Sequence, residues 1–195
     1  MLFRSPAARA TPTPWSGRRP GWGVRVSTIA VVGNPKPRSR TRSAAELVVE
    51  QLTGAPPDDV IDVIDLGPGL LGWGDAGVEQ AVAALRAAEL AVVASPTFKA
   101  TYTGLLKLFL DHVGTGDLAG VTAVPLMLGA GPMHALAPEL LLEPVLVELG
   151  ATAPTRGLYL LDRAWDSPGA LDDWLAAATG QVAAARAGHE FPSNR

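Results

Sequence analysis

The sequence predicts an α/β fold with a five-stranded parallel sheet and helices on both of its faces. Short β-branched, apolar segments alternate five times with longer segments whose apolar residues recur at three- and four-residue spacing. A chain of 195 residues is also long enough for one such domain with a substantial core, and too short to need a second. Such sheets use right-handed crossovers and bind ligands beyond the carboxyl ends of their strands.

The first predicted strand covers residues 24–32 and ends before Gly33. Similar apolar segments predict the other strands at residues 60–66, 90–94, 121–128 and 157–161. Helical spacing predicts helices at residues 44–54, 78–88, 105–113, 136–149 and 171–187. Gly54 and Gly150 are expected to end two of these helices, since glycine is the usual residue just past a helix.

The composition excludes several kinds of site. The chain has no cysteine, so disulfides, thiolate nucleophiles and cysteine metal sites are ruled out. The three histidines, His112, His134 and His189, are scattered, and without a paired histidine cluster no metal site is predicted. Glycine, proline or charge interrupts every apolar run before the ~20 residues that span a bilayer, so no membrane segment is predicted.

Residues 1–22 differ from the rest of the chain. They contain four arginines, four prolines and no acidic residue, and they lack any periodicity. We expect a disordered extension, or a start of translation placed too early, followed by one domain at residues 23–190. The formal net charge of −3 leaves −7 on the part after residue 22, which argues against a nucleic-acid surface. Arg18 and Arg19 precede Pro-Gly-Trp-Gly rather than an apolar signal segment, so a cytoplasmic location is predicted.

The loop from Gly33 to Thr41 is the first candidate binding site, because it follows the first strand and leads into the first helix. Four of the seven residues at positions 36–42 are basic. A helix N-terminus offers unpaired N–H groups and a partial positive charge, so it favours phosphate. Charged hydrogen bonds contribute roughly 1.5–3 kcal/mol each, so a few of them would hold a phosphate in place. The predicted ligands are Asn34, Lys36, Arg38, Ser39, Arg40 and Thr41.

The alternative for this loop is a solvated turn in which Ser39 or Thr41 only caps the helix. Its position after the first strand favours phosphate. The sequence contains neither G-x-G-x-x-G nor G-x-x-x-x-G-K-[ST] at this place, so a mononucleotide is predicted rather than a dinucleotide or a P-loop nucleotide.

Two further loops are expected at the same edge of the sheet. Residues 95–104, after the third strand, are too polar and turn-prone for a strand, and Phe98 or Tyr102 there is suited to border a planar ring. Packing of either aromatic on its own sheet is the alternative. Residues 129–131, after the fourth strand, read Gly-Ala-Gly, where missing side chains permit a ligand to approach the backbone or simply serve the turn.

These motifs resemble those of the NADPH-dependent FMN reductases, especially members that feed reduced flavin to two-component monooxygenases of the alkanesulfonate-degrading type. Members typically read G-S-x-R-x-x-S-x-[ST] after the first strand, where residues 33–41 read GNPKPRSRT. They also read P-x-[YF]-K-x-[ST]-[YF]-[ST]-G-x-L-K after the third strand, where residues 96–107 read PTFKATYTGLLK. The G-x-x-x-H-x-L and P-V-L elements have similar counterparts between Gly129 and Leu146, so the resemblance covers about residues 26–161.

The resemblance implies a flavodoxin-like fold and an NAD(P)H-dependent FMN reductase, with FMN and NADPH or NADH as cofactors. The first loop would hold the phosphate. The border of the isoalloxazine would be formed by Pro96, Thr97, Phe98 and Lys99, and its polar edge would meet the backbone of Gly129, Ala130 and Gly131. No catalytic side chain is expected, because the cofactor supplies the hydride chemistry. The resemblance also implies a homodimer or homotetramer and a flavin-dependent monooxygenase as partner.

The first loop departs from the family pattern at two positions. Asn34 and Lys36 stand where members usually have Ser and Arg. Lysine is a point charge without the fork geometry of arginine, so a looser phosphate grip is expected, shared with Arg38 and Arg40.

Three other functions stay open at this point. A quinone or azo-dye reductase would keep FMN bound while its acceptor turns over. A flavodoxin-type electron carrier would bind FMN without NAD(P)H activity, although such carriers usually are strongly acidic and have a T-x-T-G-x-T-like loop, which this sequence lacks. A flavin-free interaction domain of the same fold would not turn yellow with FMN. The sequence does not choose between NADPH and NADH.

Overall fold

The structure is a computed structural model that describes residues 27–189. The predicted extension at residues 1–22, and both ends of the predicted domain at residues 23–190, lie outside the described residues. The elements follow in the order β1 (Thr28–Val32), α1 (Arg40–Thr53), β2 (Asp59–Asp62), η1 (Val63–Leu71), α2 (Ala76–Arg86), β3 (Leu90–Pro96), α3 (Gly104–Leu110), β4 (Thr122–Gly129), η2 (Pro132–His134), η3 (Pro138–Leu142), α4 (Glu143–Glu148), β5 (Leu158–Leu161) and α5 (Asp172–His189).

The five strands form one parallel sheet in the order β2-β1-β3-β4-β5. This is the flavodoxin-like strand order, in which the chain reverses direction across the sheet after β2. The predicted fold class is therefore confirmed. The central strands β1, β3 and β4 are almost wholly buried, which explains why each was visible in the sequence as a continuous apolar run.

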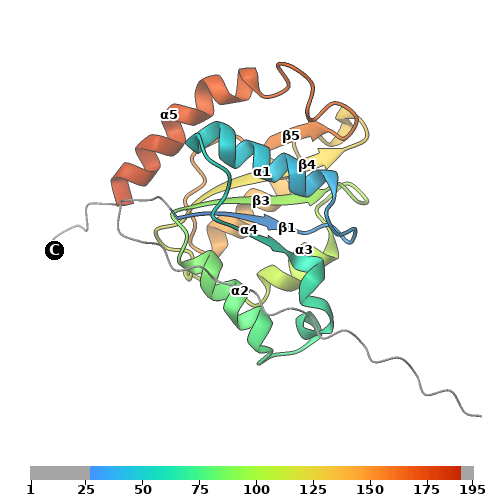
Figure 1. Ribbon diagram of the computed structural model, residues 1–195, viewed down its shortest axis with the longest axis vertical. Coiled ribbons are helices and arrows are strands. Elements are labelled where there is room, and N and C mark those ends of the chain that lie inside the picture. Colours follow the sequence, from blue (N-terminus) through green and yellow to red (C-terminus); the bar gives the residue numbers. More distant parts are fainter. Residues whose placement is uncertain (1–26, 190–195) are drawn as a thin grey trace, which may run out of the picture.

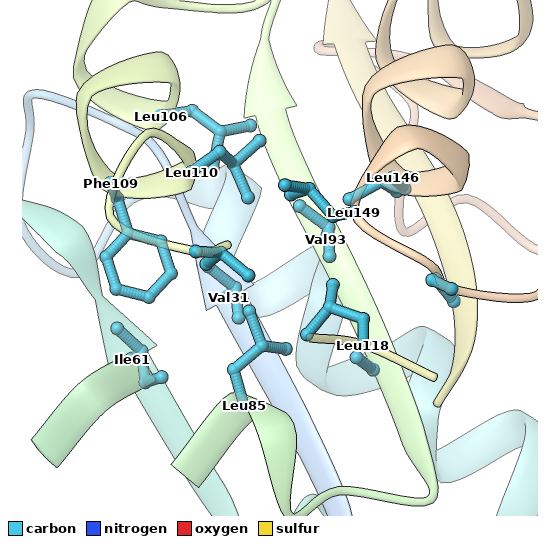
Figure 2. Packing of buried hydrophobic residues seen from close by; sticks show 14 of the residues in the cluster. Val31, Ile61, Leu85, Val93, Leu106, Phe109, Leu110, Leu118, Leu146 and Leu149 are labelled. Atoms are coloured by element: carbon cyan, nitrogen blue, oxygen red, sulfur yellow. The ribbon is translucent and has the colours of Figure 1, made fainter. Parts of the chain in front are cut away.

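Helices cover both faces of this sheet (Figure 1). Side chains of α1 and α5, including Val48 and Val182, pack against one face. Side chains of α2, α3 and α4, including Leu85, Phe109 and Leu146, pack against the other, and Figure 2 shows this second core around Val31. Alternate residues of each strand serve the two cores, because successive side chains point to opposite faces of the sheet.

The predicted second strand is too long. It ends at Asp62, and the following nine residues form the 3₁₀ segment η1. Gly67, with φ 56°, and Pro68, which has no N–H to donate, prevent residues 63–71 from extending the ladder. The predicted helix at residues 136–149 is α-helical only in α4, because residues 138–142 form the π-helical turn η3. Pro144 cannot donate to the carbonyl four residues back, and the N–H of Glu143 reaches the carbonyl of Pro138 instead.

The third strand is longer than predicted. Ser95 and Pro96, assigned to a loop from their polarity and turn propensity, continue β3 because they lie in register with Met127 and Leu128 of β4. Within the part of the chain that the structure describes, no helix has the length and apolarity required to cross a membrane.

Candidate functional site

A pocket of about 320 Å³ lies where β1, β3, β4 and β5 end. Ten of its lining residues are among the thirteen predicted from the sequence: Asn34, Lys36, Ser39, Arg40, Thr41, Pro96, Thr97, Phe98, Gly129 and Ala130. Leu128 and Asp162 also line it and were not predicted. Three predicted residues, Arg38, Lys99 and Gly131, do not line it.

The start of the first loop is packed tightly against α3. A Cβ on Gly33 would lie 2.3 Å from the Cβ of Leu106, so only glycine fits there. The hydroxyl of Thr103, which also caps α3, donates to the carbonyl of Gly33 over 2.5 Å. The loops after β1 and β3 are thereby held together at the base of the pocket.

Asn34 gives the first loop its shape. Its Oδ1 accepts the N–H of Lys36 at 2.9 Å, and its Nδ2 donates to Oγ1 of the buried Thr41 at 2.9 Å. The first bond tightens the loop, and the second joins its start to the first turn of α1. The Lys36 ammonium makes no ion pair with any described residue, and so it remains available to a ligand.

The N-terminus of α1 opens into this pocket. Ser39 is the N-cap, and its Oγ accepts the N–H of Arg42 at 3.3 Å. None of the described residues accepts a hydrogen bond from the backbone N–H groups of Arg40 and Thr41. Two free N–H groups at the positive end of a helix of 14 residues are suited to bind an anion. Ser39 therefore caps the helix, as the alternative interpretation of the loop predicted. This role is compatible with an anion site beside it.

Arg38 lies outside the pocket because its backbone is held from the other side. Its φ of 50° is left-handed, and its N–H donates to Oδ2 of Asp62 at 3.1 Å, while its side chain is exposed. In this structure Arg38 shapes the loop instead of contributing a side chain to the pocket.

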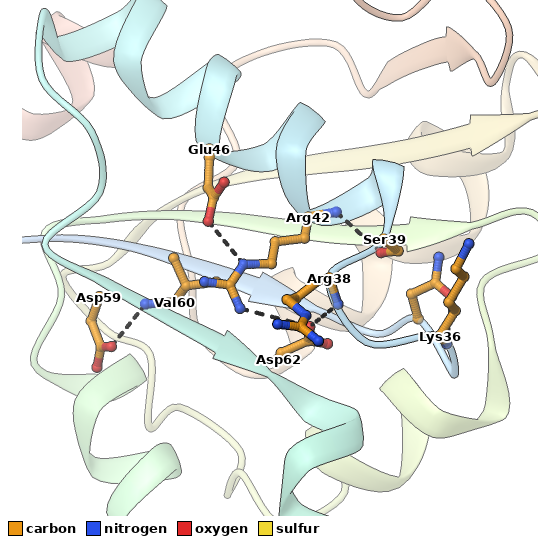
Figure 3. A network of polar contacts seen from close by, with 9 residues as sticks. Lys36, Arg38, Ser39, Arg42, Glu46, Asp59, Val60 and Asp62 are labelled. Carbon is orange, nitrogen blue, oxygen red and sulfur yellow. Dashed lines mark hydrogen bonds and ion pairs between the residues drawn. The ribbon is translucent and has the colours of Figure 1, made fainter. Parts of the chain in front are cut away.

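Asp62, at the end of β2, is the buried acid beneath the loop (Figure 3). Its Oδ2 lies 3.8 Å from a guanidinium nitrogen of Arg42, which also pairs with Glu46 at 2.9 Å. Its Oδ1 is buried without a hydrogen-bond partner. Burial raises the pKa of Asp62, as do the charges of Asp65 and Glu46, while the Arg38 N–H and the charge of Arg42 oppose the rise.

The loop after β3 is a tight, strained turn. Phe98 and Thr101 exchange backbone hydrogen bonds of 2.9 and 3.2 Å around Lys99 and Ala100, whose φ angles are 52° and 71°. Two-residue turns with positive φ normally contain Asn and Gly, so this backbone is strained. The turn places Lys99 at its tip, away from the pocket, while Phe98 lines the pocket with half of its surface exposed.

The hydroxyl of Thr97 makes no hydrogen bond with any described residue. Its N–H donates to the carbonyl of Leu128 at 2.6 Å, but its Oγ1 is buried with no hydrogen-bond partner. A buried hydroxyl without a partner costs free energy, and a polar ligand in the pocket would satisfy it.

The glycines after β4 serve a neighbouring tyrosine. A Cβ on Gly129 would lie 1.7 Å from the hydroxyl oxygen of Tyr159, and that hydroxyl donates to the carbonyl of Gly131 at 2.7 Å. Gly131 lies outside the pocket because its backbone is extended and its carbonyl is held by Tyr159. The close approach that Gly129 permits is that of the Tyr159 side chain.

Asp162 forms the far wall of the pocket, just after β5. Its N–H donates to the carbonyl of Gly129 at 2.9 Å, and its Oδ2 accepts from the guanidinium of Arg40 at 2.6 Å. The position of Asp162 directly after the fifth predicted strand was the signal that could have identified it, because all parallel strands end at one edge.

The residues of the pocket fit a phosphate joined to a larger polar and planar group. Lys36, Arg40 and two free N–H groups could bind the phosphate, while Pro96, Phe98 and Leu128 supply apolar surface. The volume is at the lower end of the ~300–1,000 Å³ usual for ligand pockets. No group of three or more metal-ligating side chains exists among residues 27–189.

Comparison with known proteins points to one family. Residues 26–166 match the model of a family described as NADPH-dependent FMN reductase. The FMN reductase (NADPH) of Escherichia coli strain K12 is 32% identical over 151 residues, which are 71% of this chain and 74% of the relative. The NADH-dependent FMN reductase SfnF of Pseudomonas putida is 30% identical over 149 residues, which are 72% of this chain and 80% of the relative.

A solved structure agrees with these relatives. The apo form of an NADH:FMN oxidoreductase, EMOB, superposes with a TM-score of 0.71 and 32% sequence identity. The match covers 87% of this chain and 92% of that chain.

Proposed function

The chain belongs to the NADPH-dependent FMN reductase family, and from this premise we propose that its FMN binds in the pocket at the carboxyl edge of the sheet. The family makes the protein an oxidoreductase that uses FMN and NAD(P)H. The assignment of individual residues to parts of the flavin is our proposal.

One observation carries this assignment. The N–H groups of Arg40 and Thr41 are free at the N-terminus of α1, in the same pocket as the cationic side chains of Lys36 and Arg40. We assign the FMN phosphate to this end. Asn34 keeps the loop in shape, and Ser39 and Thr41 fix the first turn of the helix.

The opposite end of the pocket suits the ring system. Pro96, Thr97 and Phe98 would border the isoalloxazine, and the backbone of Gly129 and Ala130 would meet its polar edge. The buried Oγ1 of Thr97, which has no hydrogen-bond partner, would make a hydrogen bond with the flavin. Phe98 is half exposed, which leaves an open side from which NAD(P)H can reach the pocket.

FMN supplies the redox chemistry when bound, because it accepts hydride from the nicotinamide. The protein therefore has to align two rings and balance charge, and it needs no acid–base pair of its own. The rigid joints between the loops, such as Thr103 with Gly33 and Tyr159 with Gly131, fix the positions from which the pocket residues act.

We also propose that the reduced flavin leaves to serve a flavin-dependent monooxygenase and that the protein forms a homodimer or homotetramer. An incomplete phosphate grip, with Lys36 in place of an arginine, supports release. Exposed Met133, Leu136, Leu140 and Leu141 around an apolar pocket of about 360 Å³ support self-association.

The test is titration of the purified protein with FMN, followed by NADPH and NADH oxidation with added FMN. We expect flavin fluorescence to be quenched on binding and oxidation to be accelerated. Arg40→Gln should weaken FMN binding by roughly tenfold, since it removes a charged hydrogen bond. If Arg40→Gln and Lys36→Gln both keep wild-type FMN binding and NAD(P)H oxidation, the phosphate binds elsewhere. Tight FMN binding with no NAD(P)H oxidation would instead indicate an electron carrier.

A further inference from the structure

Asp162 is an acid in a pocket that we assign to an anion. Among the described residues that line this pocket it is the one carboxylate, and Lys36 and Arg40 are the cations. Its backbone is fixed at the wall by the hydrogen bond from its N–H to the carbonyl of Gly129. The backbone of Asp162 therefore keeps its side chain at the wall of the pocket.

Asp162 already occupies the arginine that the phosphate needs. One terminal nitrogen of Arg40 lies 2.6 Å from Oδ2 of Asp162 and 3.5 Å from its backbone carbonyl oxygen. Arg40 is also the first residue of α1, with its own N–H free. The internal carboxylate and an incoming phosphate thus seek the same guanidinium.

The charges decide what this contact does. A phosphate monoester carries roughly −1.5 to −2 near neutral pH. Asp162 offsets one of the two cations in the pocket, which leaves Lys36 as the unpaired one. The side chains of Arg40 and Asp162 are 63% and 41% exposed, and ion pairs this exposed are weak, so a doubly charged phosphate can displace the carboxylate.

We propose that Asp162 is a built-in competitor of the FMN phosphate for Arg40, and that it determines how tightly the pocket holds FMN. FMN binding exchanges the carboxylate for phosphate on the guanidinium, and release restores the internal ion pair. This inference rests on the proposed function and deepens it, because it names a residue that keeps the flavin exchangeable.

The experiment measures the dissociation constants of FMN and of riboflavin, which lacks the phosphate, for the full chain and for Asp162→Asn. Asp162→Asn keeps the shape of the side chain and removes its charge. We expect FMN to bind about three- to tenfold tighter at low salt, with the gain shrinking as salt is raised, and riboflavin binding to stay unchanged. In an Arg40→Gln background the gain should be smaller, because the contested guanidinium is gone.

Asp111→Asn is the matched control. It removes an equally charged carboxylate from the exposed ion pair between Lys107 of α3 and Asp111, the C-cap of that helix, outside the pocket. Its FMN dissociation constant should equal that of the wild type. Thermal melting of every variant, with Asp162→Ser as a second substitution, separates binding effects from loss of folding.

Three outcomes would overturn the proposal while leaving the proposed function intact. Unchanged FMN binding in Asp162→Asn would make Asp162 a bystander, and weaker binding of FMN alone would mean that it orients Arg40. Weaker binding of both flavins would mean that it accepts a hydrogen bond from the sugar chain. Failure of the proposed function would give different results. Either the wild-type protein would not bind FMN, or Arg40→Gln would bind FMN as well as wild type does. In both cases the inference about Asp162 would also be wrong.

Discussion

At the scale of single residues, the shape of the first loop depends on Asp62. The carboxylate comes from β2, the strand next to β1, and holds the N–H of Arg38 while the backbone there is left-handed. Sequence patterns predicted the basic loop but not this support, because a strand-end aspartate looks the same whether it is buried or solvated. Only the pairing of β1 with β2 brings Asp62 beneath the loop.

Asp62→Asn should change how stability depends on pH. Burial raises the pKa of Asp62 above its ordinary value of 3.8, so ionisation is harder in the folded than in the unfolded chain. Its contribution to the free energy of unfolding is therefore highest at acidic pH below 3.8 and declines as pH rises through the raised pKa. Urea denaturation between about pH 4 and pH 7 should show Asp62→Asn gaining stability relative to wild type as pH rises.

The control for this prediction is Asp65→Asn, which keeps the buried carboxylate and removes a neighbouring exposed one. It should retain most of the decline of the wild type, because burial is the largest cause of the raised pKa of Asp62 and the charge of Asp65 adds a smaller part. Parallel curves for wild type and Asp62→Asn would show that the carboxylate is not destabilised by its burial.

Gly129→Ala should destabilise the protein because of Tyr159. The added Cβ would lie 1.7 Å from the tyrosine hydroxyl oxygen, so the ring must move and its hydrogen bond to Gly131 must break. Overpacking of this kind costs about 1–3 kcal/mol, which denaturant unfolding measures directly. Gly131→Ala is the matched control, since nothing lies within 4 Å of its Cβ position and its φ is −159°, and it should stay within about 0.5 kcal/mol of wild type. Equal losses in both variants would contradict the role given to Tyr159.

At the scale of elements, agreement between sequence and structure follows burial. Strands β1, β3 and β4 were predicted because they are buried on both faces and therefore apolar throughout. The 3₁₀ segment η1 and the π-turn η3 were not predicted, because their apolar residues resemble strand and helix patterns. Glycine and proline at local positions override those patterns, and the surrounding packing decides which conformation results.

The turn at Lys99 and Ala100 gives a prediction for an element. Ala100 has a φ of 71°, a conformation that costs an L-residue roughly 1–2 kcal/mol. Ala100→Gly should therefore stabilise the protein by about 0.5–1 kcal/mol, once the greater entropy of glycine in the unfolded chain is subtracted. Ala135→Gly is the control, because Ala135 is exposed with a φ of −57° and should lose about 0.5–1 kcal/mol. Urea denaturation of the two variants should give shifts of opposite sign, and a loss in both would mean that the turn carries no strain.

At the scale of the whole molecule, the sheet gathers the site from distant parts of the chain. Arg40 and Asp162 are 122 residues apart and meet because α1 begins, and β5 ends, at the same edge. The sequence located three of the contributing loops from their position after strands. The position of Asp162 after the fifth predicted strand places it at that edge too, but its pairing with Arg40 depends on strand order and helix placement, which periodicity does not contain.

The exposed apolar residues around the second pocket, of about 360 Å³, lead to a prediction about assembly. Leu140 is 61% exposed beside exposed Met133 and Leu136, and a second copy of the chain is the partner we propose for this surface. Light scattering after size exclusion should give a dimer or tetramer for wild type and a shift toward monomer for Leu140→Glu, because a buried charge at an interface costs several kcal/mol. Leu71→Glu is the control, since Leu71 is 78% exposed on η1 and does not line this pocket, and its variant should assemble like wild type. A monomeric wild type, or equal effects of the two substitutions, would contradict an interface at Leu140.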